Sequence, residues 1–106
     1  MYEIKEDYKC INGSMAETFT RDVSVEDAEL QAEAGTTGFR GGERAAGGRT
    51  YLRIENIGGA DFFAKALNDN SGVEIALSGD SGLMALIKAL DFASRVLTEQ
   101  AAEVND

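Results

Sequence analysis

Apolar and charged residues alternate at the start of the chain, and this pattern predicts a two-stranded hairpin. In residues 2–11, most apolar side chains fall on one face of an extended strand and charged ones on the other. Asn12-Gly13 follows, a dipeptide that favours a two-residue turn with positive φ at both positions. Folding back at this turn places Cys10 opposite Met15. Both strands then share one apolar face, so the pattern specifies the register.

Residues 24–34 fit two patterns. Ser24 can cap the start of a helix, and Gly35 is a typical residue just past a helix end. The same segment alternates small apolar residues with acidic or amide ones, as a strand does. Alanine is a good helix former and a poor strand former. We therefore predict a short helix here, with a strand as the alternative.

Residues 35–49 are predicted to form a flexible loop that is rich in glycine and arginine. The segment holds half of the chain's 12 glycines and shows no periodic pattern. Residues 50–57, 61–68 and 73–78 then alternate like strands, separated by Gly58-Gly59 and a second turn. These three strands are predicted to form an antiparallel meander.

Apolar residues recur every three or four positions after residue 80, which predicts a long C-terminal helix. Asp80 or Ser81 can cap its first turn. The charged residues 88, 91, 95 and 99 mark its solvent face. The predicted core-facing stripe comprises Leu83, Leu86, Ile87, Leu90, Ala93, Leu97, Ala101 and Val104.

These elements predict an α+β fold in the order ββα-loop-βββα. One antiparallel sheet of about five strands, the hairpin plus the meander, would be covered by the long helix and the short helix. The 106 residues suit a single domain spanning residues 1–106. The charged N-terminus is unlike a signal peptide and Cys10 has no partner for a disulfide, so a cytoplasmic protein is expected.

The composition removes most familiar catalytic chemistry. The chain has no histidine and one cysteine, so it lacks the commonest general base and thiolate metal sites. We therefore predict a protein that is not an enzyme, with no catalytic residue, no metal site and no cofactor.

The chain is strongly acidic, with a net charge of -9. Such a field repels phosphates over most of the surface and favours a protein partner with a basic surface. The predicted acidic contact residues are Glu26, Asp27, Glu29 and Glu33. In size and charge the chain looks like the anti-CRISPR and anti-restriction proteins of phages and mobile elements. This resemblance implies an inhibitor that occupies a basic nucleic-acid-binding surface of its target.

Residues 35–53 have the opposite charge, with four arginines against Glu43. The loop leads into a strand whose outer face, with that of the next strand, interleaves aromatic and basic residues. Such a face is a platform on which single-stranded nucleic acid can stack. The predicted contact residues are Phe39, Arg40, Arg44, Arg49, Tyr51, Arg53, Phe63 and Lys65.

The second part of the chain has a pattern that supports this alternative. Residues 49–97, three strands and a helix opening on Arg49-Thr50-Tyr51, are similar in topology to the PUR-type repeat. That resemblance implies binding of single-stranded nucleic acid. A homodimer that gathers two basic faces and turns the acidic residues outward would help such binding to overcome the net negative charge. The other interpretation is that this face packs on the N-terminal hairpin, the loop or a second subunit.

Overall fold

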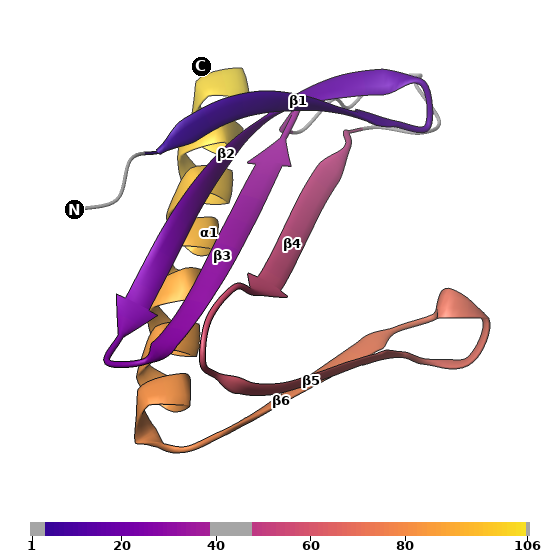
Figure 1. Cartoon of the computed structure of the whole chain (residues 1–106). Coiled ribbons are helices and arrows are strands. Elements are labelled where there is room, and N and C mark those ends of the chain that lie inside the picture. Colours follow the sequence, from indigo (N-terminus) through magenta and orange to yellow (C-terminus); the bar gives the residue numbers. More distant parts are fainter. Residues whose placement is uncertain (1–3, 39–47, 106) are drawn as a thin grey trace.

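The computed structural model describes residues 4–38 and 48–105, and it confirms the α+β class (Figure 1). The predicted contact residues Phe39, Arg40 and Arg44 lie outside the described residues. Most of the elements are strands, followed by one long helix. Their bounds are β1 (Lys5–Ile11), β2 (Ser14–Val25), β3 (Ala28–Thr36), β4 (Thr50–Asn56), β5 (Asp61–Ala66), the 3-10 turn η1 (Asn68–Asn70), β6 (Val73–Ser78) and α1 (Asp80–Asn105).

The strands form two sheets instead of the single sheet that the sequence predicted. β1, β2, β3 and β4 pair antiparallel in that order, whereas β5 and β6 pair with each other as a separate hairpin. The cause lies in the link after β4. The amide of Ile57 donates to Glu29 O at 3.0 Å and that of Gly59 to Asp27 O at 2.8 Å. These bonds carry the chain across the sheet end, so β5 leaves the edge of β4 instead of pairing with it.

Residues 24–34 do not form the predicted short helix. They contain the end of β2, a turn at Glu26 and Asp27, and most of β3. Glu26 adopts φ 56°, as a tight turn requires. The alternating residues Ala28, Leu30, Ala32 and Ala34 all face α1 and are 0–1% exposed. Pairing on both edges and burial of this face outweigh the helix propensity of alanine.

The N-terminal hairpin has the predicted register, with Cys10 opposite Met15. Its predicted apolar face is covered only in the second half of β2, where Val23 is 6% exposed. Nearer the turn, Met15 is 58% exposed, while Ala16 and Thr18 on the other face are buried. The sheet therefore curls at this end, and β1 crosses over the ends of β3 and β4 (Figure 1).

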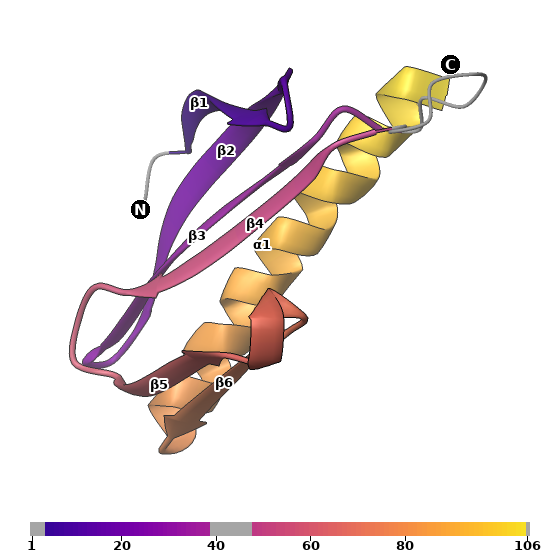
Figure 2. The same cartoon turned by 90° about the vertical axis from the view of Figure 1, so that its right-hand side faces the viewer.

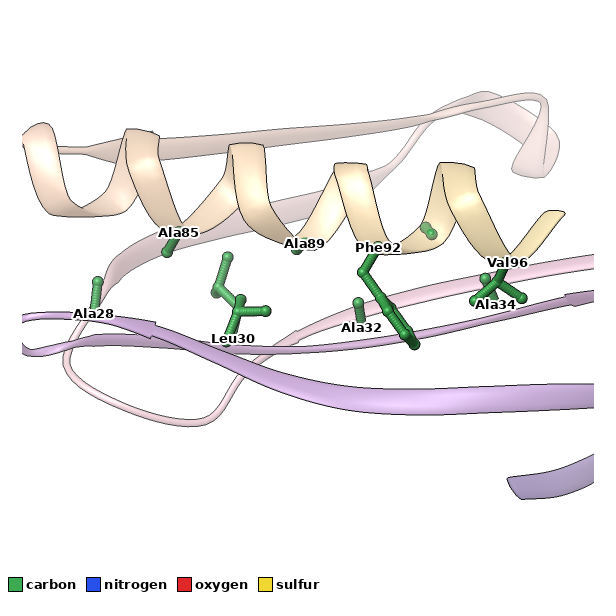
Figure 3. Close-up of a cluster of buried hydrophobic side chains, with 10 residues drawn as sticks. Ala28, Leu30, Ala32, Ala34, Ala85, Ala89, Phe92 and Val96 are labelled. Carbon is green, nitrogen blue, oxygen red and sulfur yellow. The ribbon is translucent and has the colours of Figure 1, made fainter. Parts of the chain in front are cut away.

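The core lies between α1 and the middle of the sheet, and it is built mainly from small residues. α1 contacts β3 and β2 along its length, as the perpendicular view shows (Figure 2). Ala85 and Ala89 of α1 are 0% exposed and point at Leu30 and Ala32 of β3 (Figure 3). Phe92, Ala93 and Val96 complete the helix side of the cluster.

The predicted leucine stripe of α1 is not the face that meets the sheet. Leu83, Ile87 and Leu90 are 57%, 49% and 47% exposed. Leu86 and Leu97 are partly buried against the cluster, and among the stripe residues up to Ala101 only Ala93 belongs to it. The alanines of α1 and β3 allow a closer approach than leucines would, and this approach sets the rotation of the helix.

Gly35 in β3 marks a second close approach, and its replacement tests the curl of the sheet. A Cβ atom at Gly35 would overlap Glu17 O and lie 2.7 Å from Thr18 Cγ2. Gly35→Ala should therefore lower the free energy of unfolding by about 2 kcal/mol. At Gly82 in α1 the added Cβ would meet Leu77 at an ordinary 3.4 Å. Gly82→Ala should raise stability by about 0.5–1 kcal/mol. Urea unfolding of both variants checks the opposite signs, and equal effects would contradict the close approach.

Candidate functional site

The curled end of the sheet brings β1 onto β4 through basic side chains. Arg49 donates from Nε to Ile11 O at 2.8 Å and from Nη2 to Asn12 O at 3.1 Å. Lys9 Nζ lies 5.6 Å from the centroid of the Tyr51 ring, a cation–π contact. These contacts cover the outer face of the sheet at this end with the chain's own N-terminal hairpin.

Glu33 is buried under this cover, with 2% of its side chain exposed. Arg53 donates to Glu33 Oε1 from Nε at 3.1 Å and from Nη2 at 3.0 Å. The Thr18 hydroxyl donates to Oε2 at 2.6 Å, and Lys9 Nζ lies 3.8 Å from the same oxygen. Three partners thus satisfy a carboxylate that would otherwise be costly to bury.

Arg53 is the centre of a wider network on the outer face. Its Nη1 donates to Glu55 Oε1 at 2.6 Å and its Nη2 to Gln31 Oε1 at 2.9 Å. Partial burial opposes its charge, but the hydrogen bond and charge of Glu33, then the charges of Tyr51 and Glu55, outweigh it. They raise the pKa of Arg53 above its ordinary value. The guanidinium of Arg53 is therefore already bound by two carboxylates and one amide oxygen of the protein.

The structure does not bring the predicted aromatic and basic residues onto one sheet face. Tyr51 and Arg53 lie on β4, whereas Phe63 and Lys65 lie on β5, which belongs to the other sheet. Arg49 precedes β4 and binds the β1–β2 turn. For Tyr51 and Arg53 the geometry matches the other interpretation, packing against the N-terminal hairpin and β3.

A group of acidic residues lies at the opposite end of the molecule, which we call the acidic end. It is formed by residues 25–29, 56–62 and 78–84, which meet at the start of α1 (Figure 1). These segments contain five acidic residues and no lysine or arginine. The five are Glu26, Asp27, Glu29, Asp61 and Asp80.

The four predicted acidic contact residues divide between two environments. Glu26 and Asp27 are exposed at the β2–β3 turn, and Glu29 is half-buried next to them. The backbone bond from Gly59 to Asp27 O fixes the turn against the β4–β5 link. Glu33 is separated from these three, because its carboxylate is enclosed by Thr18, Lys9 and Arg53.

A cavity of about 380 Å³ lies between the N-terminal strands and the second half of α1. Gln100 closes one side, donating to Glu17 O at 2.9 Å and accepting from the amide of Thr36 at 2.8 Å. Arg21 Nε is buried beside it without a hydrogen-bond partner. The cavity is lined by Ile4, Glu17, Phe19, Arg21, Phe92, Arg95, Val96, Glu99 and Gln100.

The cavity and the burial of Glu33 were both missed by sequence reasoning. Glu17 and Arg21 interrupt the apolar face of β2, and a charge on such a face can signal an unfilled or polar site. For Glu33 the sequence offers no comparable signal. Its neighbours Thr18 and Arg53 are 15 and 20 residues away in the chain.

The fold and the charge distribution define an α+β domain with a curled antiparallel sheet, one covering helix and an acidic end. Comparison with family models, curated proteins and solved structures found no match for this chain. Within residues 4–38 and 48–105, no group of three or more cysteine, aspartate or glutamate side chains could hold a metal ion. In the same part of the chain, no helix is both long and apolar enough to cross a membrane.

Proposed function

We propose that this chain is a non-enzymatic protein-binding module that engages a basic protein surface through its acidic end. The observation that carries the proposal is the separation of charge. One end holds five carboxylates without a lysine or arginine, while Lys9, Arg49 and Arg53 lie on the side of the curled end, where they bind the chain's own carbonyls and carboxylates. A surface of one sign steers an oppositely charged partner and orients it before contact.

Glu26 and Asp27 are the proposed primary contacts, with Glu29 beside them. Both primary residues are exposed at a tight turn whose backbone is held by Gly59. Contact residues on a fixed turn lose little conformational freedom on binding, which favours affinity. Glu33 positions β3 and β4 instead of touching the partner.

The most specific form of this proposal is an inhibitor. Carboxylates on a fixed turn can occupy sites where a nucleic-acid-binding protein holds phosphates. The anti-CRISPR and anti-restriction proteins that the chain looks like would act in this way. The alternative, binding of single-stranded nucleic acid, has less support because Arg49 and Arg53 already hold the chain's own carbonyls and carboxylates.

Charge reversal at the turn tests the proposal. The probes are a fluorescent arginine-rich peptide and a single-stranded DNA oligonucleotide, titrated separately at low and high salt. We expect the protein to bind the peptide and not the DNA, with affinity falling at high salt. Glu26→Lys/Asp27→Lys should weaken peptide binding about tenfold, because two attractive pairs of up to ~1 kcal/mol each become repulsive.

Glu6→Lys/Asp7→Lys is the matched control, because it reverses the same dipeptide on exposed β1. This control should change peptide affinity less than twofold if location matters more than net charge. Equal losses in the two variants would contradict an acidic binding end. Tight binding of DNA would favour the nucleic-acid alternative instead.

A further inference from the structure

The cavity beside the second half of α1 has apolar walls. Its volume of about 380 Å³ lies within the range of sites that hold small ligands. Phe92 and Val96 point from α1 toward the sheet and form one wall (Figure 3). Phe19 of β2 contributes to the facing wall and is partly buried against the core. The interior is therefore suited to an apolar group.

Arg21 supplies the polar group of the cavity. Within residues 4–38 and 48–105, its Nε is the one buried side-chain nitrogen or oxygen that lacks a hydrogen-bond partner. In the same part of the chain, no carboxylate pairs with its guanidinium. Buried polar groups in native proteins are nearly always hydrogen-bonded. An unsatisfied donor in the wall of a cavity therefore indicates a place for an acceptor atom of a ligand.

A water molecule would satisfy Nε of Arg21 but would not explain the rest of the cavity. Water against Phe19, Phe92 and Val96 finds few hydrogen-bond partners, and apolar cavities are poorly hydrated for this reason. A ligand that fits the whole cavity needs an acceptor for Arg21 and an apolar body that covers the walls. Removing those walls from water is favourable in proportion to the apolar area covered.

The shape of a guanidinium favours a carboxylate as the acceptor. Nε and one Nη lie side by side and can donate two parallel hydrogen bonds to the two carboxylate oxygens. Hydrogen bonds to a charged acceptor are stronger than those to a hydroxyl or carbonyl oxygen. An arginine stays charged at all ordinary pH values, so a carboxylate also neutralises its charge.

The two ends of the cavity differ in polarity. Gln100 meets Glu17 at one end, and because β2 and α1 run in opposite directions, Arg21 and Phe92 lie at the other. The ends are about 12 Å apart, which is the length of eight residues of helix. Both amide atoms of Gln100 already have partners.

The end of the cavity away from Arg21 is suited to an uncharged tail. Glu17 and Glu99 line the cavity there, and a second negative charge on the ligand would be repelled by both. A monocarboxylate therefore fits the cavity better than a dicarboxylate does. A phosphate, which carries more negative charge, fits less well for the same reason.

We propose that this cavity binds a monocarboxylate with an apolar body, held by Arg21 at its head and by Phe19, Phe92 and Val96 along its length. A chain of about eight carbons fits within the roughly 12 Å between the two ends. The inference goes beyond the proposed function and does not depend on it, because the Glu26–Asp27 turn is not part of the cavity.

Three ligands of equal chain length test the proposal by isothermal titration calorimetry on the full chain. They are octanoate, octanol, which lacks the charge, and suberate, which has a second carboxylate at the far end. At about 0.15 M salt, charges more than about 8 Å away are largely screened. We expect octanoate to bind with a dissociation constant of about 0.1 mM. Octanol and suberate should each bind at least about tenfold more weakly.

Arg21→Met tests the role of the guanidinium. It should weaken octanoate binding about 30-fold, because a charge-assisted pair of hydrogen bonds is lost. The affinity for octanol should change less than about threefold, because the apolar walls remain. Lys88→Met is the matched control, since it removes the same charge from an exposed site on α1 outside the cavity. It should change octanoate affinity less than about twofold.

Urea unfolding separates a binding role of Arg21 from a structural one. Arg21→Met should unfold at the same urea concentration as the wild type or a higher one, because it removes a buried donor without a partner. A clear fall in that midpoint would show that Arg21 serves the fold and would overturn the proposal. No octanoate binding below about 5 mM, equal affinity for all three ligands, or octanoate binding that survives Arg21→Met would each overturn it as well.

Discussion

Replacing Ala89 with leucine should lower the free energy of unfolding by about 3 kcal/mol, which is among the largest effects of a single change in this protein. Ala89 is 0% exposed and lies against β3, where Leu30 and Ala32 leave no room for a longer side chain. The added atoms must push α1 away from the sheet or force strained side-chain conformations. Urea unfolding measures the loss directly.

Ala102→Leu is the matched control, because it makes the same change on the exposed side of the same helix. It should shift the free energy of unfolding by less than about 0.5 kcal/mol. If Ala89→Leu were equally mild, the alanine face would not be the buried one. The predicted leucine stripe of α1 would then form the core, as the sequence pattern indicated.

Arg53→Met should cost about 3 kcal/mol, although the arginine side chain is 32% exposed. The substitution leaves Glu33, which is 2% exposed, with Thr18 and a lysine at 3.8 Å. Glu33→Gln should cost less, about 1 kcal/mol, because the stranded Arg53 keeps Glu55 and reaches solvent. The larger penalty therefore falls on removal of the more exposed partner.

The double variant Glu33→Gln/Arg53→Met measures the interaction free energy between Glu33 and Arg53. It should be more stable than Arg53→Met alone, because no buried charge remains uncompensated. The raised pKa of Arg53 gives stability that is present at all lower pH and lost only as strongly alkaline pH passes that pKa. Additive single losses would argue against a coupled pair.

The N-terminal hairpin shows what the sequence can specify locally. Asn12-Gly13 and the alternation around it predict both the turn and the register of β1 with β2. These features depend on neighbouring residues and on the twist that a two-residue turn imposes. The α+β class and the long C-terminal helix follow from periodicity in the same way.

In two places the local sequence pattern does not determine the structure: the secondary structure of residues 24–34, and the face of α1 that is buried. Alanine-rich β3 forms a strand because β2 and β4 pair with its two edges and α1 covers its face. The periodicity of α1 identifies two adjacent apolar faces, and closeness of packing selects the alanines for its own sheet. A pattern that counts apolar positions favours the leucines, because it contains no information on the shape of the surface opposite.

The candidate sites, too, have some features that the sequence predicts and others that only the tertiary structure shows. The acidic residues Glu26, Asp27 and Glu29 can be identified from the sequence alone. Placing Glu33 beneath Arg53 needs pairing across three strands, and the acidic end needs three distant segments to meet.

By itself, then, the sequence determined the hairpin, the class of fold, the helix and the net charge, because each depends on short-range periodicity or on composition. Only the tertiary structure decided which face of α1 is buried, which basic side chains bind groups of the protein itself, and which carboxylates lie together at the acidic end. Those outcomes depend on side-chain volume and on contacts between residues far apart in the chain, and no local pattern records them.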